Sequence, residues 1–291
     1  MNYITVDDNK IRIIDSTEIT KLTKKLLIEI NHNLSTDVVN SLKEAEKKER
    51  SAVAKNVLCR LCENIVTAKN LDVPICQDTG MAVIFAEIGK DVHIIGDRIE
   101  EAINKGVREA YLEGLMRLSI VQDPLYDRKN TNDNTPAIIH LSYTNGDNIK
   151  LTATPKGFGS ENMSTIKMFN PSATEDNIID FVIDWVKKCG SNPCPPIVVG
   201  VGIGGNFEHC AYLAKCALTR NLYDKNPNPK YDELEQKLLS KINQLNIGPQ
   251  GFGGDTTALA VKVEYAPTHI AGLPVAVNIN CHVARHISGL I

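Results

Sequence analysis

The chain has 291 residues, of which 43% are hydrophobic and 23% charged, so it can bury a core and is not predominantly disordered. Lys and Arg number 32 against 35 Asp and Glu, and the resulting net charge of −3 lacks the basic excess typical of nucleic-acid binding. No apolar run approaches the roughly 18 to 20 residues of a membrane span, and the N-terminus lacks a secretion-signal pattern. We therefore expect a cytoplasmic protein that binds neither nucleic acid nor membrane.

Helical periodicity and strand-like apolar runs alternate irregularly along the chain. The pattern predicts helices near 16–32, 36–48, 52–69, 97–114, 174–190, 206–220 and 231–245. It predicts strands over 81–89, 196–202, 258–266 and 274–281, and a hairpin over 135–157 that turns at Asn145-Gly146. We expect a mixed α/β fold, with a small N-terminal helical subdomain over 1–75 and a mixed-sheet portion over 76–291.

Eight cysteines offer candidate ligands, and three of them share one kind of position. Cys76, Cys194 and Cys281 each lie at the edge of an apolar strand, in loops that also carry other polar residues. Their separations are far too long for a zinc finger, and each taken alone is compatible with a structural thiol. If the three converge, they could hold a [4Fe–4S] cluster and leave one iron without a protein ligand, which would act as a Lewis acid.

The remaining cysteines favour structural roles. Cys59 and Cys62 form the only CxxC pair, but they lie within a helical pattern and are interpreted as buried core thiols. Cys210 and Cys216 are interpreted in the same way. Cys189, five residues before Cys194, stays an alternative ligand at this point.

Several polar side chains could act beside such a site. Gln77 and Asp78 directly follow Cys76, and Arg117 follows a predicted helix from which it could bind a carboxylate through two hydrogen bonds. His269 lies in the loop before the last predicted strand. Each of these residues could equally be an ordinary surface side chain.

Three glycine-rich segments follow or precede predicted strands: KGFGSEN (156–162), GVGIGGNFEH (200–209) and GPQGFGGDTT (248–257). The second could bind a dinucleotide, although no acidic residue follows at the required place, or its glycines could allow a helix to pack closely on a strand. The third carries Gln250, Asp255 and Thr256.

Taken together, the motifs are similar to a known family. PICQDTG, LMRLSIVQDPL, NTNDNTPAIIH, PKGFGSENMS, CPPIVVGVGIGGNFEHCAYLAKCAL, NIGPQGFGGDTTAL and PTHIAGLPVAVNINCHVARH occur in one order from about residue 15 to the end. This order resembles class I (iron–sulfur) fumarate hydratases, and more closely the alpha subunit of the two-subunit fumarase and L(+)-tartrate dehydratase family.

The resemblance implies a set of site residues. It implies a [4Fe–4S] cluster on Cys76, Cys194 and Cys281, and so favours Cys194 over Cys189. It further implies substrate contacts from Gln77, Asp78 and Arg117 and from the glycine loop with Gly157 and Gly159, where Phe158 stands in place of a third glycine. Asp78 and His269 are the implied proton-transfer residues.

The resemblance also implies a partner and a reaction. Single-chain members carry a second half with further catalytic groups, whereas this sequence stops at Ile291, so we expect a separate beta subunit in an alpha2beta2 assembly. The expected reaction is the reversible hydration of fumarate to (S)-malate, a step of the tricarboxylic acid cycle, by an oxygen-sensitive enzyme. The dehydration of L(+)-tartrate to oxaloacetate is the nearest alternative. A dinucleotide-binding oxidoreductase and a zinc-binding scaffold on Cys59 and Cys62 are alternatives from other classes.

Overall fold

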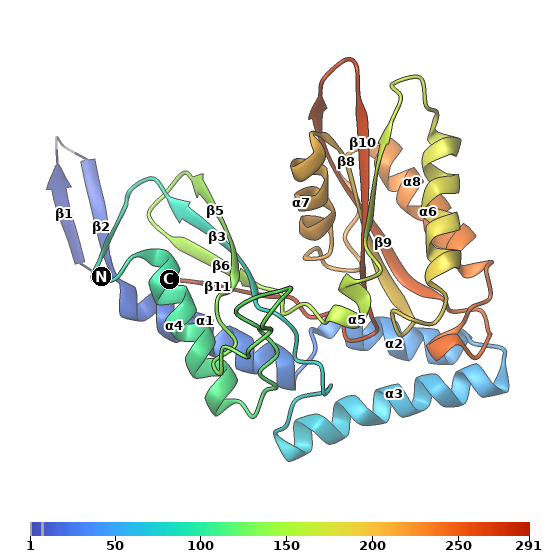
Figure 1. Ribbon diagram of the computed structural model, residues 1–291, viewed down its shortest axis with the longest axis horizontal. Coiled ribbons are helices and arrows are strands. Elements are labelled where there is room, and N and C mark those ends of the chain that lie inside the picture. The colour runs from blue at the N-terminus through green and yellow to red at the C-terminus, as the bar shows by residue number, and fades with distance from the viewer. Residues whose placement is uncertain (1, 7–8) are drawn as a thin grey trace. The chain divides into compact units, whose positions relative to one another are not determined.

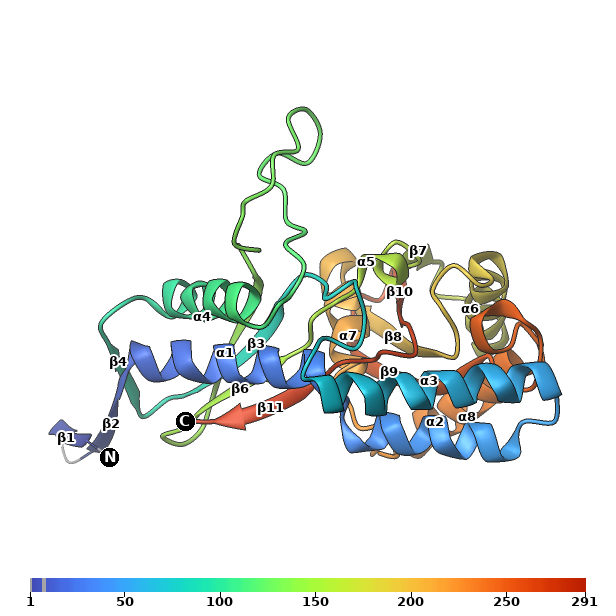
Figure 2. The ribbon, with the colours of Figure 1, turned by 90° about the horizontal axis from the view of Figure 1, so that it is seen from below.

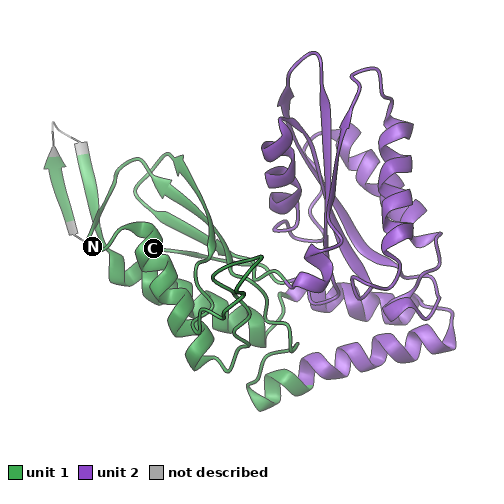
Figure 3. Cartoon of the chain, viewed as in Figure 1, with its two compact units in different colours: residues 1–35, 67–156, 285–291 green, residues 36–66, 157–284 purple. Residues whose placement is uncertain are grey.

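The structure is a computed structural model that describes residues 2–6 and 9–291 (Figure 1). The chain forms two compact units (Figure 3): one comprises residues 1–35, 67–156 and 285–291, and the other comprises residues 36–66 and 157–284. Helices and mixed sheets occur in both, which confirms the predicted mixed α/β fold. The predicted stretch 1–75 contains the three expected helices, and the chain passes from one unit to the other within it.

The described residues of the first unit form two sheets and a pair of packed helices. One sheet has the strand order β1 (Asn2–Val6), β2 (Asn9–Asp15), β4 (Val92–Ile95). The other has the order β11 (Ile287–Leu290), β6 (Ile149–Ala153), β3 (Val83–Gly89), β5 (Ile138–Thr144). Helices α1 (Ser16–His32) and α4 (Ile99–Glu113) pack against each other, and α1 also contacts β6 and β11. Their apolar side chains form one core with those of β3 and β6.

The predicted hairpin over 135–157 is wrong in its pairing. Both strands exist, but β3 lies between them, parallel to β5 and antiparallel to β6. The Asn145-Gly146 turn instead arches over the end of β3, where the Gly89 N–H donates to Asn148 O at 2.8 Å and the Asp91 N–H donates to Gly146 O at 3.0 Å. The apolar β3 takes the central place because both faces are covered there, whereas β5 is an edge strand with mostly exposed side chains.

A long connection joins α4 to β5 in the first unit. Residues 114–137 extend away from both elements as a green loop in Figure 2. Backbone hydrogen bonds across it, from the Gln122 N–H to Lys129 O at 2.8 Å and from the Thr131 N–H to Ile120 O at 2.9 Å, hold its two halves together. Arg117 lies near the start of this loop.

The second unit is a sheet covered by helices on both faces. The strand order is β7 (Thr165–Phe169), β10 (Leu273–Asn280), β8 (Ile197–Gly205), β9 (Ala258–Thr268). Helix α7 (Phe207–Ala217) packs on one face, while α6 (Glu175–Cys189) and α8 (Pro229–Asn243) contribute to the core on the other. Figure 1 shows α7 on one side of the strands and α6 with α8 on the opposite side. Further elements are α2 (Thr36–Lys48), α3 (Ala52–Leu71, continuing into the first unit), α5 (Phe158–Glu161) and a 3₁₀ turn at Pro249–Gly251.

The glycines of GVGIGG serve helix packing rather than a ligand loop. Gly200 and Gly202 lie inside β8, which is buried along nearly its whole length. A Cβ on Gly200 would lie 2.2 Å from Ala214 O, and one on Gly202 would lie 2.0 Å from Cys210 O. The close approach of α7 therefore requires glycine at both positions, which is the packing interpretation rather than the dinucleotide one.

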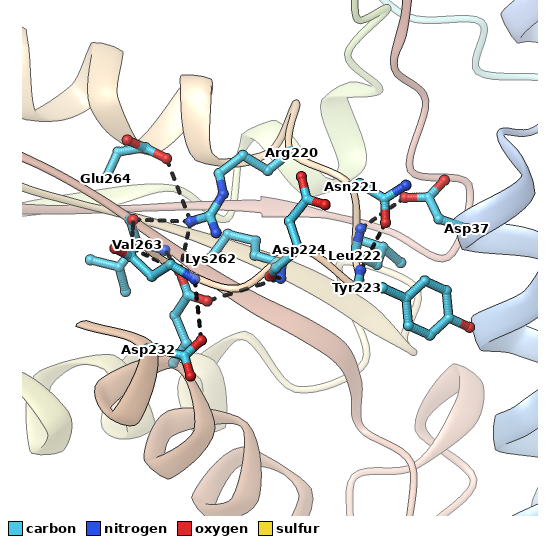
Figure 4. A network of polar contacts seen from close by, with 12 residues as sticks. Asp37, Arg220, Asn221, Leu222, Tyr223, Asp224, Asp232, Lys262, Val263 and Glu264 are labelled. Atoms are coloured by element: carbon cyan, nitrogen blue, oxygen red, sulfur yellow. Dashed lines mark hydrogen bonds and ion pairs between the residues drawn. The ribbon is translucent and has the colours of Figure 1, made fainter. Parts of the chain in front are cut away.

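A buried network of charged groups ties α8 and β9 to the connection after α7 (Figure 4). Glu235 is 2% exposed, and its Oε1 accepts from Arg220 Nη1 at 2.7 Å and from the Val263 N–H at 2.8 Å. Lys262 is 4% exposed and donates to Asp224 O. These contacts pair the Val263 N–H of β9 and one carboxylate oxygen of Glu235 on α8, which would otherwise be unpaired in the core.

Every helix predicted from periodicity is present within a few residues of its expected bounds, as are the four separately predicted strands. Strands β1, β2, β4, β7 and β11 were not predicted. Among the described residues, no helix combines the length and the apolar character that crossing a membrane requires.

Candidate functional site

The sheet of the second unit brings Cys194 and Cys281 together. Strands β8 and β10 are antiparallel neighbours with Val198 opposite Asn280, so the start of β8 lies beside the end of β10. Cys194 precedes β8 and Cys281 follows β10. The His282 N–H donates to Cys194 O at 3.3 Å, and His282 Nδ1 lies 3.1 Å from the same oxygen. The sheet order thus explains why two cysteines 87 residues apart in the sequence share one edge.

Both thiols of this pair are accessible. Cys194 is exposed and Cys281 is half-buried. Cys194 also has a φ of 55°, which a residue with a side chain seldom adopts. Strained backbone of this kind is concentrated at functional sites because the surrounding structure must maintain it.

Gln250 connects the two cysteine loops. Its backbone N–H donates to Pro195 O at 2.8 Å, and its side-chain Nε2 donates to the same oxygen at 2.7 Å. The Nε2 atom also lies 3.2 Å from His282 Nδ1. Gln250 has a φ of 53°, a second strained residue at this edge. The glycine-rich loop that carries Gln250 is visible in the sequence, but the role of Gln250 is not, because a long-range contact to Pro195 has no local sequence signal.

Cys76 belongs to the first unit, in a loop whose carbonyl groups point toward buried donors. The Tyr111 hydroxyl donates to Thr79 O at 3.1 Å and to Gly80 O at 2.8 Å, and Asn134 Nδ2 donates to Gly80 O at 3.2 Å. Burial raises the pKa of Tyr111 well above its usual range, so its hydroxyl stays a neutral donor. With its carbonyl groups held in this way, the loop presents Gln77, which is exposed, and Cys76, which is half-buried.

Arg117 is attached to the same loop. The Arg117 N–H donates to Thr79 Oγ1 at 3.0 Å, and the Thr79 hydroxyl donates to Arg117 O at 3.3 Å. Asp78 Oδ1 accepts from the Gly80 N–H at 3.0 Å. The structure therefore brings two predicted substrate-contacting segments together, with the Arg117 side chain exposed and Asp78 half-buried.

The glycine loop lies toward the cysteine edge of the second unit. Short helix α5, which begins after Gly157, contacts β10. Glu161 forms an ion pair with Lys215 at 2.6 Å and accepts from Asn278 Nδ2 at 2.8 Å, three residues before Cys281. A Cβ on Gly159 would meet no atom within 4 Å, so the backbone there is open to a ligand.

His269 lies at the opposite edge of that sheet. It occupies the loop between β9 and β10, where the Thr268 hydroxyl donates to Gly205 O at 2.8 Å, at the end of β8. The side chain of His269 is exposed, and its Nδ1 accepts from the Ala271 N–H at 3.1 Å. Because β8 has 9 residues at about 3.3 Å each, this loop and the start of β8 are separated by roughly 26 Å. Within the unit, His269 is thus not beside Cys194 and Cys281.

The other cysteines differ from this pair in accessibility. Cys189 is 4% exposed in the apolar core, and burial raises the pKa of its thiol, which disfavours the thiolate that binds metal. Cys210 is buried, as predicted. The prediction that Cys59, Cys62 and Cys216 are buried is wrong, since all three are half-buried. On α3 the cause is that only one stripe of the helix is covered.

Among the described residues, no group of three or more His, Cys, Asp or Glu side chains is arranged to hold a metal ion. The three candidate ligands are divided between the units, with Cys76 in the first and the other two in the second. The donor set nonetheless fits an iron–sulfur cluster chemically, because all three are thiols that are not fully buried.

Comparison with known proteins gives the family. The chain belongs to the fumarate hydratase (fumerase) family, whose sequence model matches residues 20–289. It is 41% identical over 272 residues to the putative L(+)-tartrate dehydratase subunit alpha of Methanocaldococcus jannaschii, covering 92% of this chain and 95% of that protein. It is 30% identical over 270 residues to the L(+)-tartrate dehydratase subunit alpha of Escherichia coli O157:H7, covering 92% of this chain and 89% of the relative. The resemblance found in the motifs is confirmed at the level of the family.

Proposed function

We propose that this chain is the alpha subunit of an oxygen-sensitive [4Fe–4S] hydro-lyase that acts on a four-carbon dicarboxylate. The observation that carries the proposal is the pairing of Cys194 and Cys281 at one sheet edge, in a chain of the fumarate hydratase family. Cys76, in its firmly held loop, is the proposed third ligand. When bound, such a cluster would supply a Lewis acid at its iron without a protein ligand.

The chain's own residues divide the remaining work. Arg117 would hold one carboxylate of the substrate through its guanidinium, together with the glycine loop, in which Gly157 precedes the open backbone at Gly159. Gln77 would orient the substrate from the Cys76 loop. Elimination of water breaks the bond from carbon to the hydroxyl oxygen and removes a proton from the neighbouring carbon. Asp78 would assist proton transfer to the departing hydroxyl.

A partner subunit is part of the proposal. The relatives named above are alpha subunits, which supports a separate beta subunit for this chain as well. The beta subunit would contribute the base that takes the carbon-bound proton, in an alpha2beta2 assembly. A cytoplasmic location suits the eight free cysteines, which a reducing compartment would keep as thiols.

Two substrates remain as candidates, and each has its own support. Fumarate, hydrated to (S)-malate, is supported by the family's description. L(+)-Tartrate, dehydrated to oxaloacetate, is supported by the names of the relatives. The two reactions differ by one hydroxyl group on the dicarboxylate, so the same carboxylate contacts would serve both.

The test is anaerobic iron–sulfur reconstitution of the wild type and of single cysteine variants. We expect a coloured protein with about four irons, lost in Cys76→Ala, Cys194→Ala and Cys281→Ala. Cys59→Ala and Cys189→Ala are the matched controls and should keep the iron. A wild type that takes up no iron, or controls that lose it equally, would contradict the proposal. Adding a candidate beta chain with malate or tartrate then distinguishes the substrates.

A further inference from the structure

Arg285 is a buried cation that contacts the loop carrying Cys76. It is 3% exposed, although arginine is almost never fully buried. Its Nη1 donates to Asn31 Oδ1 at 2.6 Å and its Nη2 donates to Asp78 O at 2.9 Å. Both acceptors belong to neutral groups, an amide and a backbone carbonyl. The Nε atom is buried and, among the described residues, has no hydrogen-bond partner.

Burial of the Arg285 guanidinium is energetically costly, which indicates that this side chain does more than fill space in the core. Burying a charge is strongly unfavourable even where hydrogen bonds offset part of the cost, and an apolar side chain would fill the same space more favourably. What an apolar side chain lacks is the planar guanidinium, which can donate in two directions at once. Arg285 uses that fork to join helix α1, through Asn31, to the backbone just beyond Cys76.

Asn31 helps to hold the backbone on both sides of Cys76. Its backbone oxygen accepts from the Ile75 N–H at 3.0 Å, immediately before the cysteine. Its side chain holds Arg285, which in turn holds Asp78, two residues after the cysteine. Asn31 is completely buried and its Nδ2 donates to Leu27 O at 3.0 Å, so the anchor is itself fixed. The Thr154 hydroxyl fixes Arg285 in the same way, by donating to its backbone oxygen at 2.8 Å.

We propose that Arg285 is the positioning residue of the loop Cys76–Asp78, and that it acts with Asn31 by fixing the backbone on both sides of Cys76. This inference deepens the proposed function, because the loop it fixes carries the proposed ligand Cys76 and the proposed substrate contacts Gln77 and Asp78. Arg285 itself touches neither substrate nor ligand sulfur in this role.

The alkylation rates of the chain's own cysteines test this proposal in protein that contains no cluster. Wild type, Arg285→Lys and Arg285→Met are prepared anaerobically without iron, treated briefly with iodoacetamide and analysed by mass spectrometry for each cysteine. Losing a charged hydrogen bond should raise local opening about tenfold, so Cys76 should react about tenfold faster in Arg285→Met. Arg285→Lys, which keeps the charge but not the fork, should lie between. Amide exchange of residues 75–80 should accelerate in the same order.

The alkylation rates of other cysteines distinguish a local effect on the Cys76 loop from a general loss of stability. Exposed Cys194 should keep its wild-type rate, and buried Cys210 should stay unreactive. Arg98→Met, which removes an exposed arginine paired with Glu101 in the same unit, is the control and should change nothing at Cys76. If Arg285→Met does not fold, Arg285→Lys carries the test alone.

Two results would overturn the proposal: an unchanged rate at Cys76, or a parallel rise at Cys76 and Cys210, which would mean general loosening. Neither result bears on the proposed function, because no cluster is present. Conversely, a wild type that fails to take up iron contradicts the proposed function while the alkylation pattern still tests Arg285. With the cluster reconstituted, we expect Arg285→Lys to lose its visible absorbance in air faster than the wild type.

Discussion

The two edges of the second unit's sheet differ in how firmly their candidate residues are held. At the edge where β8 begins, backbone and side-chain hydrogen bonds join Cys194, Gln250 and His282 into one cluster. At the edge where β8 ends, the hydrogen bonds of His269 are both local, from the Ala271 and Gly272 N–H groups, and neighbouring Ile270 is 90% exposed. One edge is preorganised within the unit, and the other is an open loop.

This difference separates two roles that the family resemblance had grouped together. A dicarboxylate of four carbons is far shorter than the nine-residue strand between the edges. A substrate beside Cys194 and Cys281 therefore does not reach His269 of the same unit. The cysteine edge has the geometry of a ligand site, whereas the His269 loop is an exposed surface loop of the kind that often contributes to binding.

The largest expected effect tests His269 directly. In the alpha2beta2 assembly, where the exposed His269 loop of one alpha subunit can complete the site of the other, His269→Ala should lower turnover by about a hundredfold or more, the usual contribution of a general acid or base. Iron content and the visible spectrum should stay at wild-type values, because His269 lies away from the cysteine pair. Ile270→Ala, at the adjacent exposed position, should affect neither. Unchanged turnover would remove His269 from the catalytic set, and lost iron would contradict the separation of the two edges.

The next effect concerns the strand that sets the distance between the edges. Gly202→Ala would place a Cβ 2.0 Å from Cys210 O in helix α7, so α7 must move away from β8. We expect a loss of about 3 kcal/mol in unfolding free energy, the upper range for overpacking a core. Gly159→Ala is the matched control, since its Cβ meets no atom within 4 Å. Urea unfolding of both variants checks this, and equal stabilities would refute the close packing of α7.

The elements that sequence analysis predicted well are those set by local pattern. Helices such as α6 and α8 follow from apolar spacing and end signals within the segment itself, and both ends fell within a few residues. Strand pairing is not determined locally. The hairpin prediction failed because nothing in the residues of β5 and β6 indicates that β3 lies between them. Short edge strands such as β11 carry too few residues to show a period.

The same limit applies to the candidate site. Cys194 and Cys281 could be chosen because each adjoins an apolar run, but their meeting depends on β8 and β10 being neighbours. Buried donors such as Arg285 and Tyr111 were not recognised, because in sequence they are an ordinary arginine near a terminus and an ordinary helical tyrosine. Their importance comes from the carbonyl groups that they meet in the folded unit.

A moderate effect is expected from loosening the cysteine edge. Gln250→Ala removes the side-chain hydrogen bond to Pro195 O and the contact with His282. Two such contacts are worth about 1 to 2 kcal/mol in unfolding free energy. Amide exchange should accelerate at residues 281–283, while the His269 loop keeps its wild-type rates. Gln244→Ala, at an exposed position before the same loop, is the control. Equal acceleration at both edges would mean that the edges are coupled rather than independent.

The smallest effect concerns the ion pair that fastens the loop leading into β9 at the cysteine edge. Arg50 Nε and Nη2 each lie 2.7 Å from an oxygen of Asp255, and this hydrogen bonding holds the pKa of Asp255 below its ordinary value of 3.8. The folded state therefore binds the proton less readily than the unfolded chain. The stabilisation is fully present above the unfolded pKa and is lost as the pH falls through the lower, folded pKa. Asp255→Asn should have a slightly lower melting temperature than the wild type at neutral pH.

That difference should shrink as the pH falls below about 4, where the unfolded carboxyl begins to bind its proton. Arg50→Gln should show the same pH dependence, because it removes the other partner of the same pair. A difference in melting temperature that persists unchanged into strong acid would mean that packing, rather than the charge of the ion pair, stabilises this loop. In that case the order of the cysteine edge would rest on Gln250 and on Glu49, which accepts from the Asp255 and Thr256 N–H groups.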